Sequence, residues 1–197
     1  MEDGPEASPI GTREQVLRTA LELFRAQGYD GTSLRQIADR LGMTKAALYY
    51  HFPAKENLIV ELTRPMLDEL AQLLAEAKTR VPASLAHARM ALLGAYLDLF
   101  IRHHEVVSLL ARDTGALQHP DVIQRARALV EALHVALTGP DGTEEERIRV
   151  GCAMGALNSI ANMPAAEVSR ARETVLDAAL ATLDVRRPGR QRAKRSG

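Results

Sequence analysis

The segment TSLRQIADRLGMTKAALYYHF, residues 32–52, decides the fold. Its first apolar residues recur at the spacing of one face of a short helix, and they are Leu34, Ile37, Ala38 and Leu41. Gly42 follows that stripe, where a residue that tolerates a positive φ ends a helix, and Thr44 can cap the next helix. The second helix has few side chains that could anchor it in a core. Two short helices around a glycine turn predict a helix-turn-helix, whose second helix fits the major groove of DNA.

Three runs around this segment follow one another at the spacing of three helices. They are F-x-x-x-G-Y-D-x-T (Phe24, Gly28, Tyr29, Asp30, Thr32), R-Q-I-A-x-x-L-G-M (35–43) and L-Y-Y-H-F-x-x-K-E-x-L (48–58). With these runs, residues 12–62 resemble the DNA-binding domain of the tetracycline-repressor (TetR) family of bacterial transcription regulators. The resemblance implies a dimeric DNA-binding regulator that is cytoplasmic, acts as a repressor and is released from its operator by a small molecule.

Composition indicates an all-α protein. The chain has 197 residues, 46% of them hydrophobic, and its prolines and glycines fall mostly between segments of helical periodicity. No apolar run approaches the ~20 residues that a membrane span requires. The acidic N-terminus has no apolar core and does not resemble a signal peptide, and the single cysteine suits a reducing compartment.

Charge is unevenly distributed although the formal net charge is zero. The tail Arg186–Gly197 carries six basic residues and no acidic one. Such a tail is predicted to be disordered. Two interpretations of the tail remain open. It keeps the chain soluble and has no other role, or it adds salt-dependent, sequence-independent affinity for DNA.

The periodic pattern predicts four regions. These are a flexible arm (1–11), the helix-turn-helix domain (12–58), a ligand-binding and dimerisation domain (59–185) and the basic tail (186–197). About nine helices are expected, with the first over 12–26 and later ones from about 53 and over about 84–102, 105–112, 120–137, 144–162 and 167–183. Thr12 with Gln15 can form a capping box, and Pro65 predicts a kink or break in the fourth helix.

The resemblance assigns DNA contacts within the helix-turn-helix. It directs Lys45, Ala46, Ala47 and Tyr49 toward the groove, and Tyr50, His51 and Lys55 toward phosphates. Thr44, at the start of the helix, can offer its hydroxyl and nearby backbone amides to a phosphate. Lysine can donate to guanine, alanine methyls can contact thymine methyls, and hydroxyl and ammonium groups suit phosphates. Two alternatives remain open: one tyrosine packs against the first helix with Tyr49 exposed, and His51 is a packed helix cap. Leu48 and Phe52 are expected in the core.

Reading two half-sites requires two recognition helices, so a homodimer is expected. The C-terminal helices carry a run of small residues that lets helix backbones approach closely. With apolar residues of the last helix, this run predicts a four-helix interface formed by Gly151, Cys152, Gly155, Leu157, Ile160, Val175, Leu176, Ala179 and Leu180. The alternative is that residues 151–156 pack within one subunit.

By resemblance, the fourth to seventh helices enclose an effector cavity. Its candidate residues are Met66, Leu70, Met90, Tyr96, Phe100, His103, Arg112 and His134. A mostly apolar lining suits a lipophilic effector. No cofactor or metal is expected, because adjacent histidines at 103–104 point to different helix faces. Cys152 is expected to be a small buried packing residue and not a redox switch.

Two other functions are alternatives to a DNA-binding regulator. A helical-bundle enzyme would need inward carboxylates with E-x-x-H ligands, and neither these nor G-x-S-x-G, a phosphate-binding loop or H-E-x-x-H occur. The other alternative is a protein-interaction module that retains only the shape of a helix-turn-helix. The sequence identifies neither the operator nor the effector.

Overall fold

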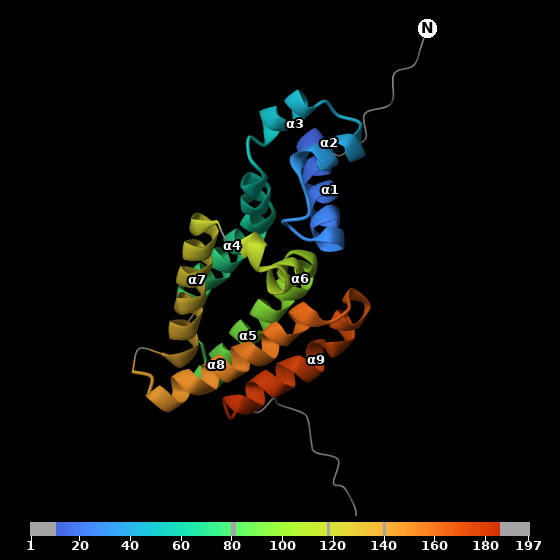
Figure 1. Ribbon diagram of the computed structural model, residues 1–197. Helices are drawn as coiled ribbons and strands as arrows, with labels where there is room; N and C mark the ends of the chain where they lie inside the picture. The colour runs from blue at the N-terminus through green and yellow to red at the C-terminus, as the bar shows by residue number, and fades with distance from the viewer. Residues whose placement is uncertain (1–10, 80–81, 118, 140, 186–197) are drawn as a thin grey trace, which may run out of the picture. The chain divides into compact units, whose positions relative to one another are not determined.

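The computed structural model describes residues 11–79, 82–117, 119–139 and 141–185. The predicted arm, apart from Gly11, and the basic tail lie outside these residues. The described part contains nine α-helices, two short 3-10 helices and no strand, so the all-α prediction is confirmed (Figure 1). The elements are α1 (Thr12–Gln27), α2 (Leu34–Leu41), α3 (Lys45–His51), α4 (Lys55–Thr79), α5 (Leu85–Arg102), α6 (His104–Arg112), η1 (Thr114–Leu117), α7 (Pro120–Thr138), α8 (Glu144–Asn158), η2 (Ser159–Asn162) and α9 (Ala165–Thr182).

Within the described ranges, no helix has the length and apolar character needed to cross a membrane.

The first of two compact units combines α1, α2, α3 and the start of α4 with a later stretch of chain, residues 105–126. The sequence predicted a boundary at residue 58, whereas this unit extends to Leu67 and includes α6. One core joins these parts: Phe24, Ile37 and Leu58 are buried together with Leu109 of α6 and Ala116 of η1. The helix-turn-helix therefore shares its hydrophobic core with a segment that follows it by more than one helix.

The ends of α2 form as the sequence predicted. Ser33 accepts a hydrogen bond from the Gln36 amide (3.2 Å), and the Gln36 side chain binds back to the Ser33 amide (2.7 Å). Gly42 ends the helix with φ 65°, a left-handed conformation that glycine adopts without a Cβ penalty. The Met43 amide then binds the carbonyl of Ala38 (2.9 Å), which closes the turn before α3.

One prediction about a helix end is wrong, and of the kink or break predicted at Pro65 the break does not occur. Gly11 is the N-cap of α1 and no side chain caps it, so the capping box from Thr12 does not form. Pro65 lies inside α4 and does not end it. The exposed proline removes one amide donor, while the nearby Thr63 hydroxyl donates to the carbonyl of Ile59 (2.8 Å) in the preceding turn.

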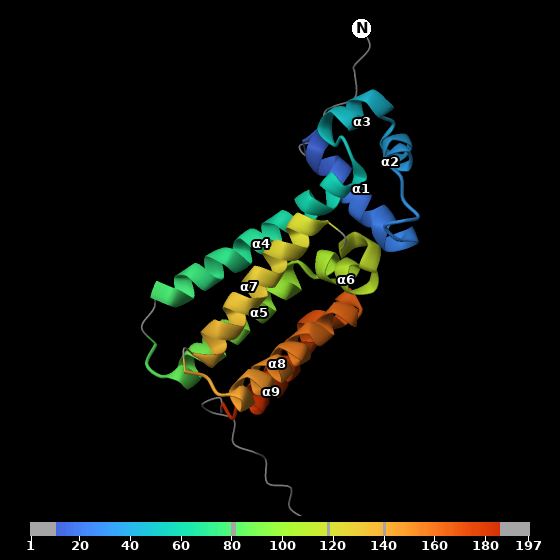
Figure 2. The same cartoon turned by 60° about the vertical axis from the view of Figure 1, so that its left-hand side comes forward.

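The second unit comprises residues 68–104 and 127–197, of which the described residues form the rest of α4 with α5, α7, α8 and α9. Figures 1 and 2 show α8 and α9 side by side and running in opposite directions, with η2 between them in the chain. Helix α5 approaches α9 closely, since a Cβ at Gly94 would meet the Leu176 side chain at 3.9 Å. Apolar residues of α5, α7, α8 and α9 form the core, including Leu93, Leu133 and Leu157.

A buried arginine joins α5, α7 and α8. Arg89 is 9% exposed, and its Nε donates to the Leu137 carbonyl (2.8 Å) while Nη2 reaches the Glu146 carboxylate (3.1 Å). Glu146 also completes a capping box with Thr143. The Thr143 backbone amide and the Arg89 guanidinium hold the pKa of Glu146 below its ordinary value. Arg89 thus satisfies the C-terminal end of α7 and the N-terminal end of α8.

Replacing Arg89 with methionine should destabilise the fold. Methionine fills similar space but leaves the Leu137 carbonyl without its donor, a loss of about 1–3 kcal/mol in unfolding free energy. Urea denaturation monitored by circular dichroism measures this loss. The control is Arg170→Met on the exposed face of α9, which should change stability by less than about 0.5 kcal/mol. Equal stability of both variants would contradict the role given to Arg89.

Candidate nucleic-acid interface

Helix α3 is attached to the first unit by two side chains. Leu48 is 0% exposed and Phe52 is 1% exposed, and both belong to the core of that unit. They lie four residues apart, so they fall on one face of the helix. The remaining faces of α3 are therefore directed away from the core, as the sequence predicted.

The outward faces of α3 carry the residues that the sequence predicts to contact DNA. Lys45, Ala46 and Ala47 are exposed, Tyr49 is 49% exposed and Tyr50 is 86% exposed. The alternative that one tyrosine packs against α1 is wrong for Tyr50, and Tyr49 retains a large free surface. The His51 ring is half-buried and meets the Tyr50 ring edge-on at 5.4 Å. His51 thus supports Tyr50 at the end of the helix.

The first turn of α3 is set by Thr44. Its side-chain oxygen accepts a hydrogen bond from the Ala47 amide at 3.2 Å, the N-cap geometry that the sequence predicted. The hydroxyl proton remains a donor that can be directed at a phosphate.

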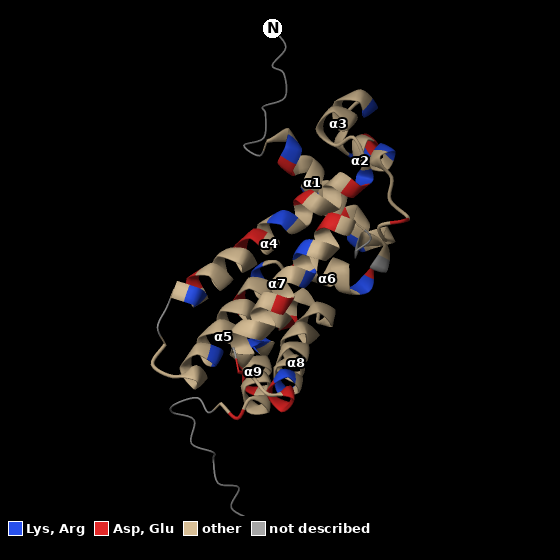
Figure 3. Ribbon diagram, turned by 90° about the vertical axis from the view of Figure 1, so that its left-hand side faces the viewer, with Lys and Arg blue, Asp and Glu red and all other residues tan. Residues whose placement is uncertain are grey.

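The charge on the helix-turn-helix differs between its two helices. Helix α3 contains a basic residue and no acidic one, whereas basic and acidic residues both occur along α2 (Figure 3). One further cation was missed in the sequence analysis. Arg35, in the first turn of α2, is exposed, with Asp39 at 3.6 Å as its ion-pair partner. The first helix of such a motif crosses the DNA backbone, so an exposed cation in its first turn was the available signal.

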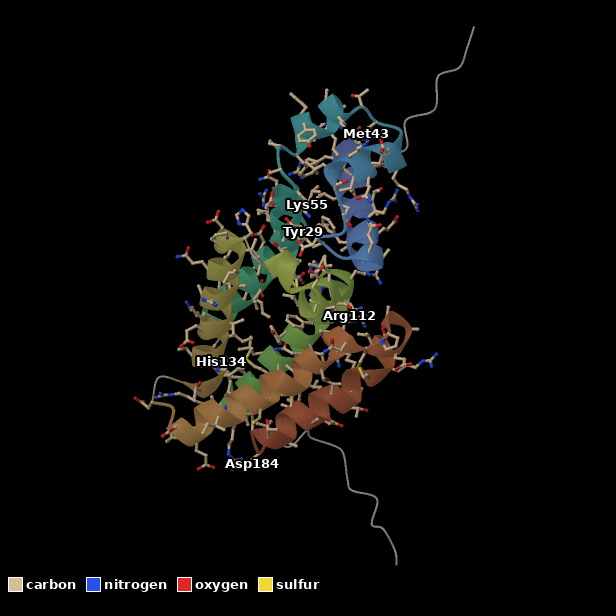
Figure 4. All side chains as sticks on the ribbon, in the orientation of Figure 1. Tyr29, Met43, Lys55, Arg112, His134 and Asp184 are labelled. Atoms are coloured by element: carbon tan, nitrogen blue, oxygen red, sulfur yellow. The ribbon has the colours of Figure 1, made fainter. Side chains whose placement is uncertain are left out.

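Lys55 does not have the predicted role. Its Nζ donates to the Tyr29 carbonyl at 2.7 Å and lies 4.0 Å from the centre of the Tyr29 ring. Figure 4 shows the two side chains beside each other. The ammonium group is thereby committed to a contact inside the first unit, so the prediction that it binds a phosphate is corrected. Burial and the neighbouring Glu56 carboxylate raise the pKa of Tyr29 to about 12.

The turn that bears Tyr29 is also bound by the segment after α6. The Asp113 carboxylate accepts hydrogen bonds from the Tyr29 amide (2.5 Å) and from the Gly115 amide (3.0 Å). A Cβ at Gly115 would lie 3.1 Å from carboxylate oxygens of both Asp113 and Asp30, so the loop approaches the turn closely. Arg25 of α1 pairs with Glu105 of α6 at 2.6 Å. These contacts fix the turn between α1 and α2 from outside the helix-turn-helix.

The predicted effector residues are divided between the two units. Met66 and Arg112 belong to the first, and the other six belong to the second. Tyr96 is 1% exposed, its hydroxyl binds Asn158 (3.2 Å), and burial raises its pKa. His103 binds the Glu69 carboxylate (2.8 Å). Two cavities of the second unit are lined by other residues, so the assignment of these side chains to a pocket stays a prediction.

The predicted dimer residues separate into two groups. Gly151, Cys152 and Gly155 are exposed on one face of α8, and a Cβ at either glycine would meet no atom within 4 Å. The apolar members are buried within the subunit, and they are Leu157, Ile160, Val175, Leu176, Ala179 and Leu180. Their place in the interface is corrected, because the periodicity that marked them reflects packing of α8 and α9 against their own chain.

Neither of the adjacent histidines forms a metal site. His103 pairs with Glu69, and His104 is buried with Nε2 at 3.0 Å from the Ile160 carbonyl. Among the described residues, no group of three or more His, Cys, Asp or Glu side chains could hold a metal ion. The expected burial of Cys152 is also wrong, since its side chain is exposed.

Comparison with known proteins identifies relatives of this chain. Residues 16–62 match the family model for bacterial regulatory proteins of the tetR family. The chain is 33% identical over 147 residues to the HTH-type transcriptional regulator LmrA of Bacillus subtilis, covering 72% of this chain and 73% of that protein. It is 47% identical over 55 residues to the class C tetracycline repressor of Escherichia coli, covering 28% and 25%. A TetR family member from Streptomyces coelicolor shares the fold, with a TM-score of 0.68, 22% identity and coverage of 91% and 96%.

Replacing Lys55 with methionine should affect stability and leave the phosphate contacts intact. The variant loses a charge-assisted hydrogen bond and a ring contact, about 1–3 kcal/mol of unfolding free energy. Below its melting temperature, its DNA affinity should keep the wild-type dependence on salt. A decrease of about one in the slope of log K against log salt would instead show that Lys55 contacts a phosphate.

Proposed function

We propose, from the premise that the chain belongs to the tetR family of bacterial regulatory proteins, that it is a dimeric repressor released from its operator by a small, largely apolar molecule. Its function as a DNA-binding transcriptional regulator follows from that family. The observation that carries the proposal is α3, which is anchored by Leu48 and Phe52 and exposes its other faces.

The exposed residues of α3 supply both kinds of DNA contact. Lys45 can donate to guanine O6 and N7, while Ala46 and Ala47 allow close approach and can contact thymine methyls. Thr44 and Tyr50 have hydroxyl donors for phosphates. Tyr49 lies between these groups in sequence and can reach either the groove or its edge. Arg35 replaces Lys55 as the phosphate-binding cation.

Operator binding tests this function against its alternatives. A gel-shift assay with the DNA upstream of the protein's own gene, at two salt concentrations, should show specific complexes that weaken as salt increases. A protein-interaction module or an enzyme would bind operator and random DNA alike, or neither. Such a result would contradict the proposed regulator.

Lys45→Ala should weaken operator binding without changing stability. Lys45 is exposed, and the loss of one base contact costs about 1–3 kcal/mol, roughly a five- to 150-fold increase in Kd. The variant should also relax the preference at one base pair of the site. Fluorescence anisotropy with operator and random duplexes measures both effects. The matched control is Lys78→Ala at the far end of α4, for which operator affinity should not change.

Dimerisation supports the reading of two half-sites, whose centres are separated by about 34–36 Å. The outer face of α8 has Ile148, Gly151, Cys152 and Gly155 at helical spacing, and Ile148 is 62% exposed. Thr174, Ala178 and Ala181 are exposed at similar spacing along α9. Small side chains around one large apolar residue allow two copies of this helix pair to approach closely. We assign the interface to these outward faces in place of the buried residues.

Gly155→Leu should reduce the dimer without affecting the folded protomer. Within one chain a Cβ at this position meets no atom within 4 Å, so leucine is accommodated unless a partner covers the face. Sedimentation velocity should then detect monomer for this variant at concentrations where the wild type is dimeric. Ala128→Leu, on an exposed position of α7, is the control and should remain dimeric. An unchanged dimer mass for Gly155→Leu would contradict the assigned interface.

Release from DNA follows as a shift between two dimer conformations. The ligand-free dimer holds its two α3 helices at the operator spacing, and the effector binds more tightly to a conformation with another spacing. An effector with equal affinity for both conformations would shift nothing. A small molecule that binds tightly and leaves operator affinity unchanged would therefore contradict this mechanism.

A further inference from the structure

Two cavities of the second unit adjoin along α4 and α5 and share part of their lining. Their volumes are about 490 Å³ and 560 Å³, and Leu73, Glu76 and Ala95 line both. Together they form what we term the α4–α5 groove. It follows α5 from His87 to Arg102, about 22 Å at the helical rise of 1.5 Å per residue. Each volume lies within the range of about 300–1,000 Å³ that small-molecule sites occupy.

One end of the α4–α5 groove is apolar and walled by small side chains. Its walls include six alanines from α4, α5, α7 and the residues before α5, and these are Ala77, Ala83, Ala88, Ala91, Ala95 and Ala136. Leu73 and Leu92 are the larger apolar residues, His87 contributes an imidazole ring, and no Phe, Tyr or Trp lines either cavity. This end, which we term the alanine chamber, therefore provides mainly aliphatic contacts.

The other end is polar, and its charges are already paired within the protein. Glu69 binds Arg102 and His103. These hydrogen bonds outweigh the effect of burial and hold the pKa of Glu69 below its ordinary value. Asp98 accepts two hydrogen bonds from Arg172 of α9, at 2.6 and 2.8 Å, and they raise the pKa of Arg172.

Each carboxylate at the polar end already has a hydrogen-bond donor. Arg102 binds Glu69, Arg172 binds Asp98, and the Gln72 side-chain amide donates to Glu76 (3.1 Å). A charged ligand group that displaced Arg102 or Arg172 would leave a charge of the protein without its partner, which is costly. A neutral hydroxyl can instead donate to a carboxylate oxygen and accept from a guanidinium or from the Gln72 amide.

We propose that the α4–α5 groove binds an uncharged aliphatic molecule with a terminal hydroxyl, its chain in the alanine chamber and its hydroxyl at the polar end. This inference rests on the proposed function, because it names the chemical class of the effector that releases the repressor. Charges already paired within the protein at one end and a mainly aliphatic wall at the other are the two observations that select this class.

Three probes with the same chain and different head groups test the proposal. Decan-1-ol, decanoate and decylammonium are titrated into the full-length protein at pH 7 by isothermal titration calorimetry, below their aggregation concentrations. Decan-1-ol should bind at least tenfold more tightly than either charged probe. Equal Kd values for the three, tighter binding of a charged probe, or no binding of decan-1-ol would each overturn the proposal.

Substitutions locate the site. Ala91→Phe fills the alanine chamber and should weaken decan-1-ol binding at least tenfold, whereas Ala128→Phe, on an exposed position of α7 outside the groove, should not change it. Thermal melts establish that both variants fold. Should Ala91→Phe fail to fold, Ala83→Phe replaces it, because Ala83 is exposed and lies before the first residue of α5. Unchanged binding in a folded chamber variant would overturn the site.

Gel shifts separate this proposal from the function on which it rests. If the wild type binds its operator but not decan-1-ol, the ligand proposal fails and the regulator stands. If decan-1-ol binds while no operator complex forms, the site stands and the proposed function fails. Decan-1-ol that binds in the groove and releases the operator supports both.

Discussion

The burial of Leu48 and Phe52 is the constraint on which the DNA-binding surface depends. A seven-residue helix cannot be stable by itself in water, so α3 exists because these two side chains attach it to the core of the first unit. Only one narrow face is used for that attachment. The other faces are free for contact with DNA, and their side chains can vary without loss of the fold. Structure and recognition are thus assigned to different residues of one short helix.

Contacts around Tyr29 hold the turn that joins α1 to the helix-turn-helix. Lys55 binds its carbonyl and ring face, and Asp113 binds its amide, so three segments of the first unit meet at one residue. The three contacts use different atoms of Tyr29 and do not compete. A displacement of Asp113 would reach the helix-turn-helix directly, because this carboxylate binds the turn between α1 and α2.

The local features of the helix-turn-helix were predictable because they depend on residues close in sequence. Gly42 at the turn, the N-cap at Thr44 and the anchors Leu48 and Phe52 all follow from spacing and backbone preference. Lys55 was misassigned because its partner, Tyr29, is 26 residues away and a lysine beside a recognition helix resembles a phosphate contact. Periodicity likewise marked Leu176 as apolar without showing whether it faces its own chain or a partner. The groove could not be predicted, because alanine at helical spacing gives no sign of the space beside it.

The core that α6 and η1 share with the helix-turn-helix has a consequence for biosynthesis. The ribosome releases α1 to α3 long before it reaches Asp113, so the recognition helix emerges onto an unfinished support. The core of the first unit is completed by Leu109 and Ala116 only after α5 has also been made. Translation therefore delivers a DNA-reading head whose core is completed late, after residues 68–104 of the second unit and before residues 127–197.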